Sequence, residues 1–295
     1  MSYEGTKMAP LNEKKVPHDE ELIKKLDSIA VSLRRDSLVM TTKAGSGHIG
    51  GSLSAAEIVA ALYFHQIRHD PQNPKWEDRD RFILSKGHAC PVVYAALAMV
   101  GYFPREELWK LRKAGSMLQG HPDMRKTPGV EASTGTLGQG LSIGEGIALS
   151  ARLDGKSYRV YVLLGDGELD EGQVWEAAMS ASHYWIDNLT AIVDLNRHQL
   201  SGPTDKIMSL KPVADKWRAF GWHVIEIDGH RTKQILDSLD EAEGIKGKPT
   251  VIIAKTFKGK GVSFVEGSFA KGHYQHHGVP LTESELTKAL EELRE

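Results

Sequence analysis

RVYVLLGDGELDEGQVWEAAMSASHYWIDNLTAIVDLNRH, residues 159–198, is the stretch that decides the fold class of this chain. It contains two short apolar runs, residues 159–164 and 189–194, which predict two buried strands. Between them, the spacing of apolar side chains over residues 172–184 predicts a helix. A strand, a helix and a second strand in this order are typical of a crossover unit, in which the two strands are parallel.

The same alternation of strands and helices continues on both sides of this unit. Further apolar runs rich in β-branched residues predict strands at residues 81–84, 223–227 and 250–254. Helices are predicted at residues 19–43, 54–67, 91–100, 138–153, 213–220 and 232–245. We therefore expect an α/β fold with a mainly parallel, doubly wound sheet and helices on both faces. No repeat or linker divides the sequence, so residues 21–295 are predicted to form one domain after an N-terminal extension, residues 1–20.

The start of the second helix carries a local signal. Ser54 and Glu57 have the spacing of a capping box, in which a hydroxyl and a carboxylate bind free backbone amides at the start of a helix. This pattern predicts that the helix begins at Ser54 and ends before Pro71.

The composition excludes several functional classes. Its 37 basic and 39 acidic residues leave a formal charge of -2, so bulk electrostatics favour neither nucleic acid nor an anionic membrane as a partner. Residues 1–20 lack the apolar core of a secretion signal, and no apolar run reaches the ~18 residues that would span a bilayer. The single cysteine, Cys90, is expected to be a buried structural thiol rather than an activated one. Together these features predict a soluble protein of the reducing cytoplasm.

Polar residues follow two of the predicted strands. Gly165-Asp166-Gly167-Glu168 comes after the strand at 159–164, and Asn196-Arg197-His198 comes after the strand at 189–194. In parallel sheets ligands bind beyond the carboxyl ends of the strands. A carboxylate between glycines and a nearby side-chain amide supply hard oxygen ligands and free backbone amides, which suit Mg²⁺ bridging a diphosphate. Taken alone, Gly-Asp-Gly is equally typical of a tight turn.

Further motifs narrow this interpretation to one family. In chain order they are Ser46-Gly47-His48, Asp78 to Phe82 leading into Ser85-Lys86-Gly87-His88-Ala89, Gly120-His121-Pro122, and Ser133 to Gly140. Gly165-Asp166-Gly167 followed by Asn196 resembles the cofactor motif of thiamine-diphosphate enzymes, and the whole series resembles the transketolases. The resemblance extends from about residue 22 to residue 281 and covers the amino-terminal third to half of a full transketolase. Ile49 stands where many transketolases have proline.

The resemblance implies that thiamine diphosphate is bound through Mg²⁺, for which Ca²⁺ or Mn²⁺ can substitute. It implies that Asp166 and Asn196 bind the metal through side-chain oxygens and that His198 binds it through its backbone carbonyl. The other cofactor-binding positions that it implies are His88 and Gly167 at the diphosphate, Gly135 and Leu137 through backbone groups, Leu200 at the thiazolium, and Lys258 and His277 at further positions on the cofactor.

The resemblance also implies a set of catalytic residues. The histidines expected around the reacting carbon and the substrate hydroxyls are His48, His88, His121 and His277. Imidazole suits this task because it can donate or accept a hydrogen bond near neutral pH. His273 and His276 are rivals of His277, and these three residues could instead form a metal-binding tract. Glu171 matches a glutamate of the acidic network between paired active sites, although a carboxylate is also favoured at a helix start.

The implied activity is transfer of a two-carbon ketol unit from a ketose phosphate to an aldose phosphate, as in the pentose phosphate pathway. The pyrimidine-binding domain is expected in a separate C-terminal subunit, so that two of these chains and two partner chains form the working heterotetramer. The alternatives are the α subunit of a 2-oxoacid dehydrogenase, a relative of deoxyxylulose-phosphate synthase, and a split transketolase for an unusual sugar. A non-catalytic diphosphate-binding module is the alternative from a different class.

Overall fold

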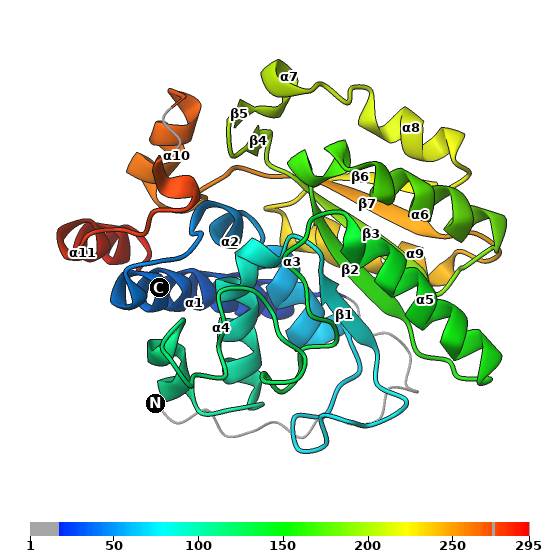
Figure 1. Ribbon diagram of the computed structural model, residues 1–295, viewed down its shortest axis with the longest axis horizontal. Coiled ribbons are helices and arrows are strands. Elements are labelled where there is room, and N and C mark those ends of the chain that lie inside the picture. Colours follow the sequence, from blue (N-terminus) through cyan, green and yellow to red (C-terminus); the bar gives the residue numbers. More distant parts are fainter. Residues whose placement is uncertain (1–17, 273–274, 295) are drawn as a thin grey trace.

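The protein is built around a five-stranded sheet in which every strand is parallel to its neighbours (Figure 1). The computed structural model describes residues 18–272 and 275–294. The strands are β1 (Arg81–Leu84), β2 (Val160–Gly165), β3 (Leu189–Leu195), β6 (His223–Asp228) and β7 (Thr250–Lys255). They lie in the order β1-β2-β3-β7-β6. All five predicted strands are therefore confirmed.

The strands alternate with helices along the chain. The helices are α1 (Glu20–Ala44), α2 (Gly50–Ser54), α3 (Ala56–Ala61), α4 (Cys90–Val100), α5 (Gln139–Leu153), α6 (Gly172–His183), α7 (Thr204–Ile207), α8 (Val213–Ala219), α9 (Thr232–Gly244), α10 (Ser263–Ala270) and α11 (Glu283–Glu292). A short hairpin of β4 (His198–Gln199) and β5 (Gly202–Pro203) follows β3. In the described residues, none of the helices combines the length and the apolar character that crossing a bilayer requires.

Both faces of the sheet are covered by helices, which confirms the doubly wound fold (Figure 1). Because side chains alternate along a strand, Phe82 and Tyr161 lie in the core formed with α1, α3, α4 and α9. Their neighbours Ile83 and Val162 lie in the core formed with α5, α6 and α8. The strands are buried on both faces, as their almost uninterrupted apolar sequences require.

Two helices near the C-terminus, α10 and α11, were not predicted. They pack with α1 and α2 in a third apolar cluster that includes Leu38, Phe269 and Leu286. A complete capping box begins α11, since the Thr282 hydroxyl accepts from the amide of Glu285 and the Glu285 carboxylate accepts from the amide of Thr282. This pattern was available in the sequence as a helix-start signal.

The capping box predicted at Ser54 is wrong. The second helical segment begins earlier, at Gly50, and Ser54 is the last residue of α2. Its hydroxyl donates to the carboxylate of Asp194 at 2.6 Å and to the carbonyl of Gly51. Glu57 instead accepts from Arg34 of α1 at 2.5 Å. Both polar side chains serve long-range contacts, which local spacing does not reveal.

Parallel strands bring their carboxyl ends to one edge of the sheet, and the chain segments that carry the predicted site follow these ends. The 3₁₀ helix Gly87–Ala89 follows β1, and the 3₁₀ helix Gly167–Asp170 follows β2. Asn196 follows β3, and Lys258 lies three residues beyond β7. The edge formed by β1, β2, β3 and β7 is therefore where the functional residues gather.

The close approach of α5 to the end of β1 can be tested with two glycines of the same helix. A Cβ atom at Gly140 would lie 2.3 Å from Oγ and 2.7 Å from Cα of Ser85, whereas a Cβ atom at Gly146 would meet open space. We expect Gly140→Ala to lower the free energy of unfolding by about 1–3 kcal/mol through overpacking. Gly146→Ala, the control, should raise it by about 0.5–1 kcal/mol because alanine favours helix. Urea unfolding measures both, and equal stability of the two variants would contradict this packing.

Candidate active site

Four histidines from four separate segments form a cluster at the carboxyl edge of the sheet. The ring centroid of His48 lies 5.3 Å from that of His88, 5.5 Å from that of His277 and 6.4 Å from that of His121. The rings of His88 and His277 stack at 5.6 Å. The structure thus brings together all four histidines that were predicted to be catalytic, and we call them the histidine cluster.

The structure distinguishes His277 from one of its two rivals. His277 belongs to the cluster, whereas His276 is 4% exposed and its ring lies against Phe264, at a centroid distance of 6.3 Å. His273 lies outside the described residues. Within residues 18–272 and 275–294, no group of three or more His, Cys, Asp or Glu side chains is arranged to hold a metal ion. Among these residues the metal-binding interpretation of the histidine tract thus gains no support.

The histidine cluster is electrically neutral near pH 7. Burial, with the charges of Lys86 and neighbouring groups, holds the pKa of His88 well below its usual range. Burial and the Arg112 charge lower the pKa of His48 to about 4, and burial with the Lys258 charge lowers the pKa of His277 to about 3. Neutral imidazoles act here as hydrogen-bonding groups rather than as fixed charges.

The predicted metal ligands lie at the neighbouring ends of β2 and β3. Asp166 is buried, and its two carboxylate oxygens accept backbone N–H groups of Gly167 at 2.9 Å and Arg197 at 2.5 Å. Burial, together with the charge of Asp194, raises the pKa of Asp166 to about 7. The Oδ1 atom of Asn196 accepts from the amide of His198 at 3.1 Å. These contacts hold both side chains close to the strand ends.

Lys258 connects the predicted metal ligands with the histidine cluster. Its Nζ donates to the backbone carbonyl of His198 at 2.8 Å and to Nδ1 of His277 at 2.8 Å. Burial lowers the pKa of Lys258 to about 8, although the carboxylate of Asp166 opposes this shift. The carbonyl predicted to bind the metal therefore already accepts one hydrogen bond from a cation.

A buried ion pair that sequence analysis missed lies behind the metal ligands. Nζ of Lys86 and the carboxylate of Asp194 are 2.5 Å apart, and their side chains are 1% and 0% exposed. Further donors to Asp194 are the Ser54 hydroxyl, the Thr256 hydroxyl and the Asn196 amide. Burial disfavours ionisation of Asp194, but Lys86 and these hydrogen bonds still lower its pKa. The available signal was a carboxylate that ends an otherwise apolar strand.

Glu168 holds the loop of residues 133–138, which contains two predicted cofactor-binding positions, against the turn after β2. Its carboxylate accepts from the Ser85 hydroxyl at 2.5 Å and from the amides of Gly138 and Gly165, each at 2.9 Å. Within this loop Gly135 has a φ of 141°, and a Cβ atom there would lie 3.1 Å from the His121 ring. A glycine is therefore needed where the backbone passes the histidine cluster.

Three predicted positions lie outside these close contacts. The side chain of Leu200 is 68% exposed. Leu137 is half-buried in the turn before α5. Glu171 is exposed at the N-cap of α6, where its side chain makes no capping hydrogen bond. Cys90, in contrast, is buried, and burial raises the pKa of its thiol to about 12, which is consistent with a structural role.

The residues at this edge fit a divalent cation and an anionic cofactor. A cation would stabilise the ionised form of Asp166, which is disfavoured by burial and by the charge of Asp194. Asn196 and the His198 carbonyl add neutral oxygens, as hard cations prefer. On the side of the histidine cluster, Nδ1 of His48 is buried and has no hydrogen-bond partner among the described residues. This orphaned atom is suited to a group that the described residues do not supply.

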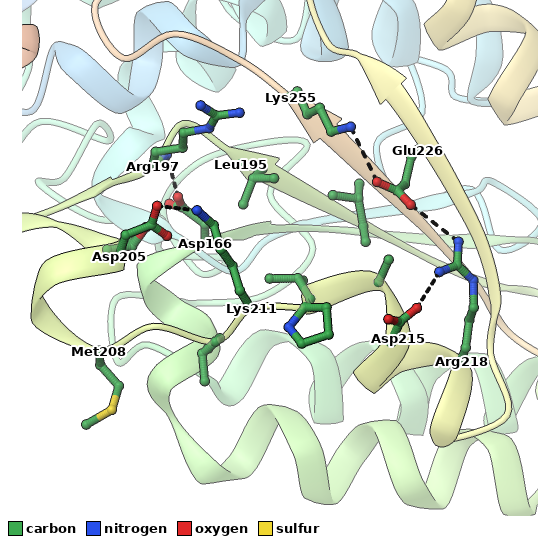
Figure 2. A pocket seen from close by; sticks show the side chains of 16 residues that line it. Asp166, Leu195, Arg197, Asp205, Met208, Lys211, Asp215, Arg218, Glu226 and Lys255 are labelled. Atoms are coloured by element: carbon green, nitrogen blue, oxygen red, sulfur yellow. Dashed lines mark hydrogen bonds and ion pairs between the residues drawn. The ribbon is translucent and has the colours of Figure 1, made fainter.

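A cavity of about 310 Å³ lies beside Asp166 and Arg197. Figure 2 shows ion pairs among its charged side chains, with Lys211 beside Asp205 and Arg218 between Asp215 and Glu226. None of the four histidines lines this cavity. The histidine cluster therefore lies outside this cavity, although the predicted metal ligand Asp166 forms part of its lining.

Comparison with protein families and curated relatives shows the family of the chain. The family model described as transketolase, thiamine diphosphate binding domain, matches residues 27–294. The chain is 49% identical over 261 residues to 6-deoxy-6-sulfo-D-fructose transketolase subunit SqwG of Clostridium sp. (strain MSTE9), covering 88% of this chain and 93% of that protein. It is 44% identical to an apulose-4-phosphate transketolase subunit of Phocaeicola vulgatus, covering 89% and 91% of the two chains. With human transketolase the identity is 44%, over 93% of this chain but 43% of that protein.

Solved structures of transketolases also resemble this chain. Transketolase from Campylobacter jejuni superposes with a TM-score of 0.85 at 35% identity, covering 92% of this chain and 43% of that one. Transketolase from Pichia stipitis in complex with sedoheptulose 7-phosphate superposes with a TM-score of 0.84 at 34% identity, covering 91% and 40%. The likeness to these longer chains thus extends over less than half of their length.

The buried ion pair behind the site can be tested by removing one charge. We expect Asp194→Asn to lower the free energy of unfolding by about 3–5 kcal/mol, because Lys86 would be left buried without its partner. The control is Asp215→Asn, which removes the exposed partner of Arg218 and should change stability by no more than about 0.5 kcal/mol. Urea unfolding distinguishes the two, and a mild effect of Asp194→Asn would contradict a central role for the pair.

The neutral state of His88 predicts a pH dependence of stability. The folded chain holds the pKa of His88 well below its usual range, whereas the unfolded chain binds a proton there below about pH 6.5. His88 therefore contributes a fall in the free energy of unfolding as the pH drops from 7 to 5. In His88→Gln the free energy of unfolding should fall less steeply with decreasing pH, because unfolding takes up as much as one proton fewer. Urea unfolding at pH 7, 6 and 5 measures it, and an unchanged slope would show that His88 is protonated in the folded chain.

Proposed function

Because the chain belongs to the transketolase family, whose thiamine diphosphate binding domain it matches, we propose that it is the N-terminal subunit of a split transketolase. Together with a C-terminal partner subunit it transfers a two-carbon ketol unit from a ketose phosphate to an aldose phosphate. Residues 21–295 form its diphosphate-binding domain. The observation that carries the proposal is the histidine cluster beside the strand-end oxygens of Asp166 and Asn196.

The split organisation rests on the lengths of the relatives. The chain spans 93% and 91% of two relatives that are named as subunits, but only 43% of human transketolase. The partner would supply the pyrimidine-binding and C-terminal parts, in an assembly of two chains of each kind. Light scattering of the mixed subunits measures the mass of the assembly and so tests this stoichiometry.

Thiamine diphosphate, when bound, supplies the carbon nucleophile and the electron sink for cleavage of the carbon-carbon bond. Asp166, Asn196 and the carbonyl of His198 would hold Mg²⁺, and Gly167 and His88 would contact the diphosphate. Gly135, Leu137, Leu200 and Lys258 would line the rest of the cofactor. The chain's own contribution is to orient the metal ion and the cofactor. It also directs N–H groups of the histidine cluster at substrate oxygens, where charge develops.

Exposed apolar side chains close in sequence to the predicted site residues support docking of the partner at this edge. Met124, Leu200, Phe257 and Val279 are 56%, 68%, 63% and 55% exposed. Each lies within three residues of His121, His198, Lys258 or His277 in the sequence. An apolar rim around a polar site favours closure by another protein surface, which would also exclude water.

A second candidate concerns the donor sugar. Two relatives that are named as subunits carry the names of 6-deoxy-6-sulfo-D-fructose and apulose 4-phosphate. A split transketolase that cleaves such a modified sugar would use the same histidine cluster, because the two-carbon ketol unit, which contains the carbonyl carbon, is the part that is transferred from each donor.

The proposal predicts activity only from the assembled enzyme. The chain is mixed with Mg²⁺, thiamine diphosphate and its partner, and two-carbon transfer to ribose 5-phosphate is followed from xylulose 5-phosphate, 6-deoxy-6-sulfofructose or apulose 4-phosphate. Transfer from any donor that requires both subunits supports a split transketolase, and the preferred donor selects between the two candidates. Activity of the chain alone would overturn the split organisation. Decarboxylation of pyruvate in place of transfer would assign the chain to another thiamine-diphosphate enzyme.

The histidine cluster separates catalysis from plain cofactor binding. We expect His121→Ala to lower kcat/KM of the assembled enzyme about 100-fold or more, as loss of a proton-transfer or hydrogen-bonding group does. His183→Ala, on α6 and outside the cluster, is the control and should leave kcat/KM unchanged. Unchanged turnover of His121→Ala would favour a diphosphate-binding module without catalysis by these residues.

A further inference from the structure

Lys258 makes a contact that decides the hydrogen-bonding role of His277. Its side chain is 5% exposed and lies between the end of β7 and α10. Nζ of Lys258 lies 2.8 Å from Nδ1 of His277 and 2.8 Å from the carbonyl oxygen of His198. It also lies 5.2 Å from the ring centroid of Phe269. Two acceptor atoms and an aromatic face thus surround the ammonium group.

The chemistry of the two groups determines where the hydrogen of His277 lies. An ammonium group has three N–H donors and no acceptor, so the nitrogen that faces it must offer a lone pair. Nδ1 of His277 therefore carries no hydrogen. A neutral imidazole has one N–H group, and the ring of His277 is neutral near pH 7 because burial and the Lys258 charge lower its pKa. The hydrogen must then lie on Nε2.

We propose that Lys258 is a positioning residue that holds His277 in the Nε2–H tautomer, which makes His277 a hydrogen-bond donor and not a proton acceptor toward the substrate. The role toward the substrate rests on the proposed function, whereas the tautomer is a property of the chain alone. Within residues 18–272 and 275–294 no hydrogen bond occupies Nε2 of His277. The N–H group is thus available to a ligand.

The position of this donor fits the chemistry of the site. His277 is half-buried. Its ring centroid lies 5.5 Å from that of His48 and 5.6 Å from that of His88. A fixed N–H donor in a partly buried site stabilises negative charge that develops on an oxygen, and it needs no reorientation during the reaction. Proton acceptance then falls to a group of the assembled site other than His277.

The tautomer can be measured directly in the full chain. The chain is labelled with ¹⁵N-histidine, and long-range ¹H–¹⁵N correlation spectra are recorded at pH 6.5, with His277→Gln to assign the signals. We expect a pyridine-type shift for Nδ1 and a pyrrole-type shift for Nε2 in the native chain. Lys258→Met removes the donor at similar side-chain length. It should admit the other tautomer and move the two nitrogen shifts toward each other.

Two further variants separate positioning from general structural effects. Lys258→Arg keeps a donor without an acceptor and should retain the native pattern. Lys260→Met removes a neighbouring lysine, whose Nζ lies 5.7 Å from the ring centroid of Phe257, and should leave the His277 signals unchanged.

A pyrrole-type Nδ1 in the native chain, or identical His277 shifts in Lys258→Met, would overturn the proposal. If Lys258→Met fails to fold, the spectra of the native chain and of Lys258→Arg decide. Failure of transketolase activity would leave these spectra as they are, so the two proposals can fail separately.

Discussion

The site depends on one buried ion pair, Lys86 with Asp194. Removing both charges from water costs several kcal/mol for each ion, so the pair is tolerated only when its remaining hydrogen-bonding capacity is satisfied. Ser54, Thr256 and Asn196 donate to the carboxylate, and the carbonyl of Gly51 accepts from the ammonium group. A single carboxylate at the end of β3 thereby joins the residues that follow β1 and β7 to the end of α2.

This arrangement also determines the character of the metal-binding edge. A carboxylate can only accept, so the atom of Asn196 that faces Asp194 must be the amide nitrogen, which leaves Oδ1 for another partner. The charge of Asp194 adds to burial in raising the pKa of Asp166, and a cation at this edge relieves both effects. Lys258 supplies a positive group nearby and carries the same network to His277. The metal edge and the histidine cluster are therefore parts of one hydrogen-bonded unit.

How much of this the sequence predicts depends on how local the signal is. The five strands and most helices follow from apolar spacing, and Asp166 and Asn196 follow from their places after two strands. The roles of Ser54 and Lys86 depend on contacts 140 and 108 residues away, which no local pattern contains. Spacing likewise could not choose between His276 and His277, because the choice depends on which ring packs against Phe264. The helices α10 and α11 were missed, although the capping box at Thr282 was a readable signal.

The most direct test of the account is calorimetric titration of thiamine diphosphate into the chain mixed with its partner. We expect binding that requires Mg²⁺, is lost in Asp166→Asn, and is retained in Asp205→Asn. Asp205 lines the same cavity as Asp166 but pairs with Lys211 and is not a predicted metal ligand, so the last variant is the matched control. Binding in the presence of a chelator, or binding of Asp166→Asn at the native affinity, would contradict a metal and diphosphate site at the carboxyl edge of the sheet.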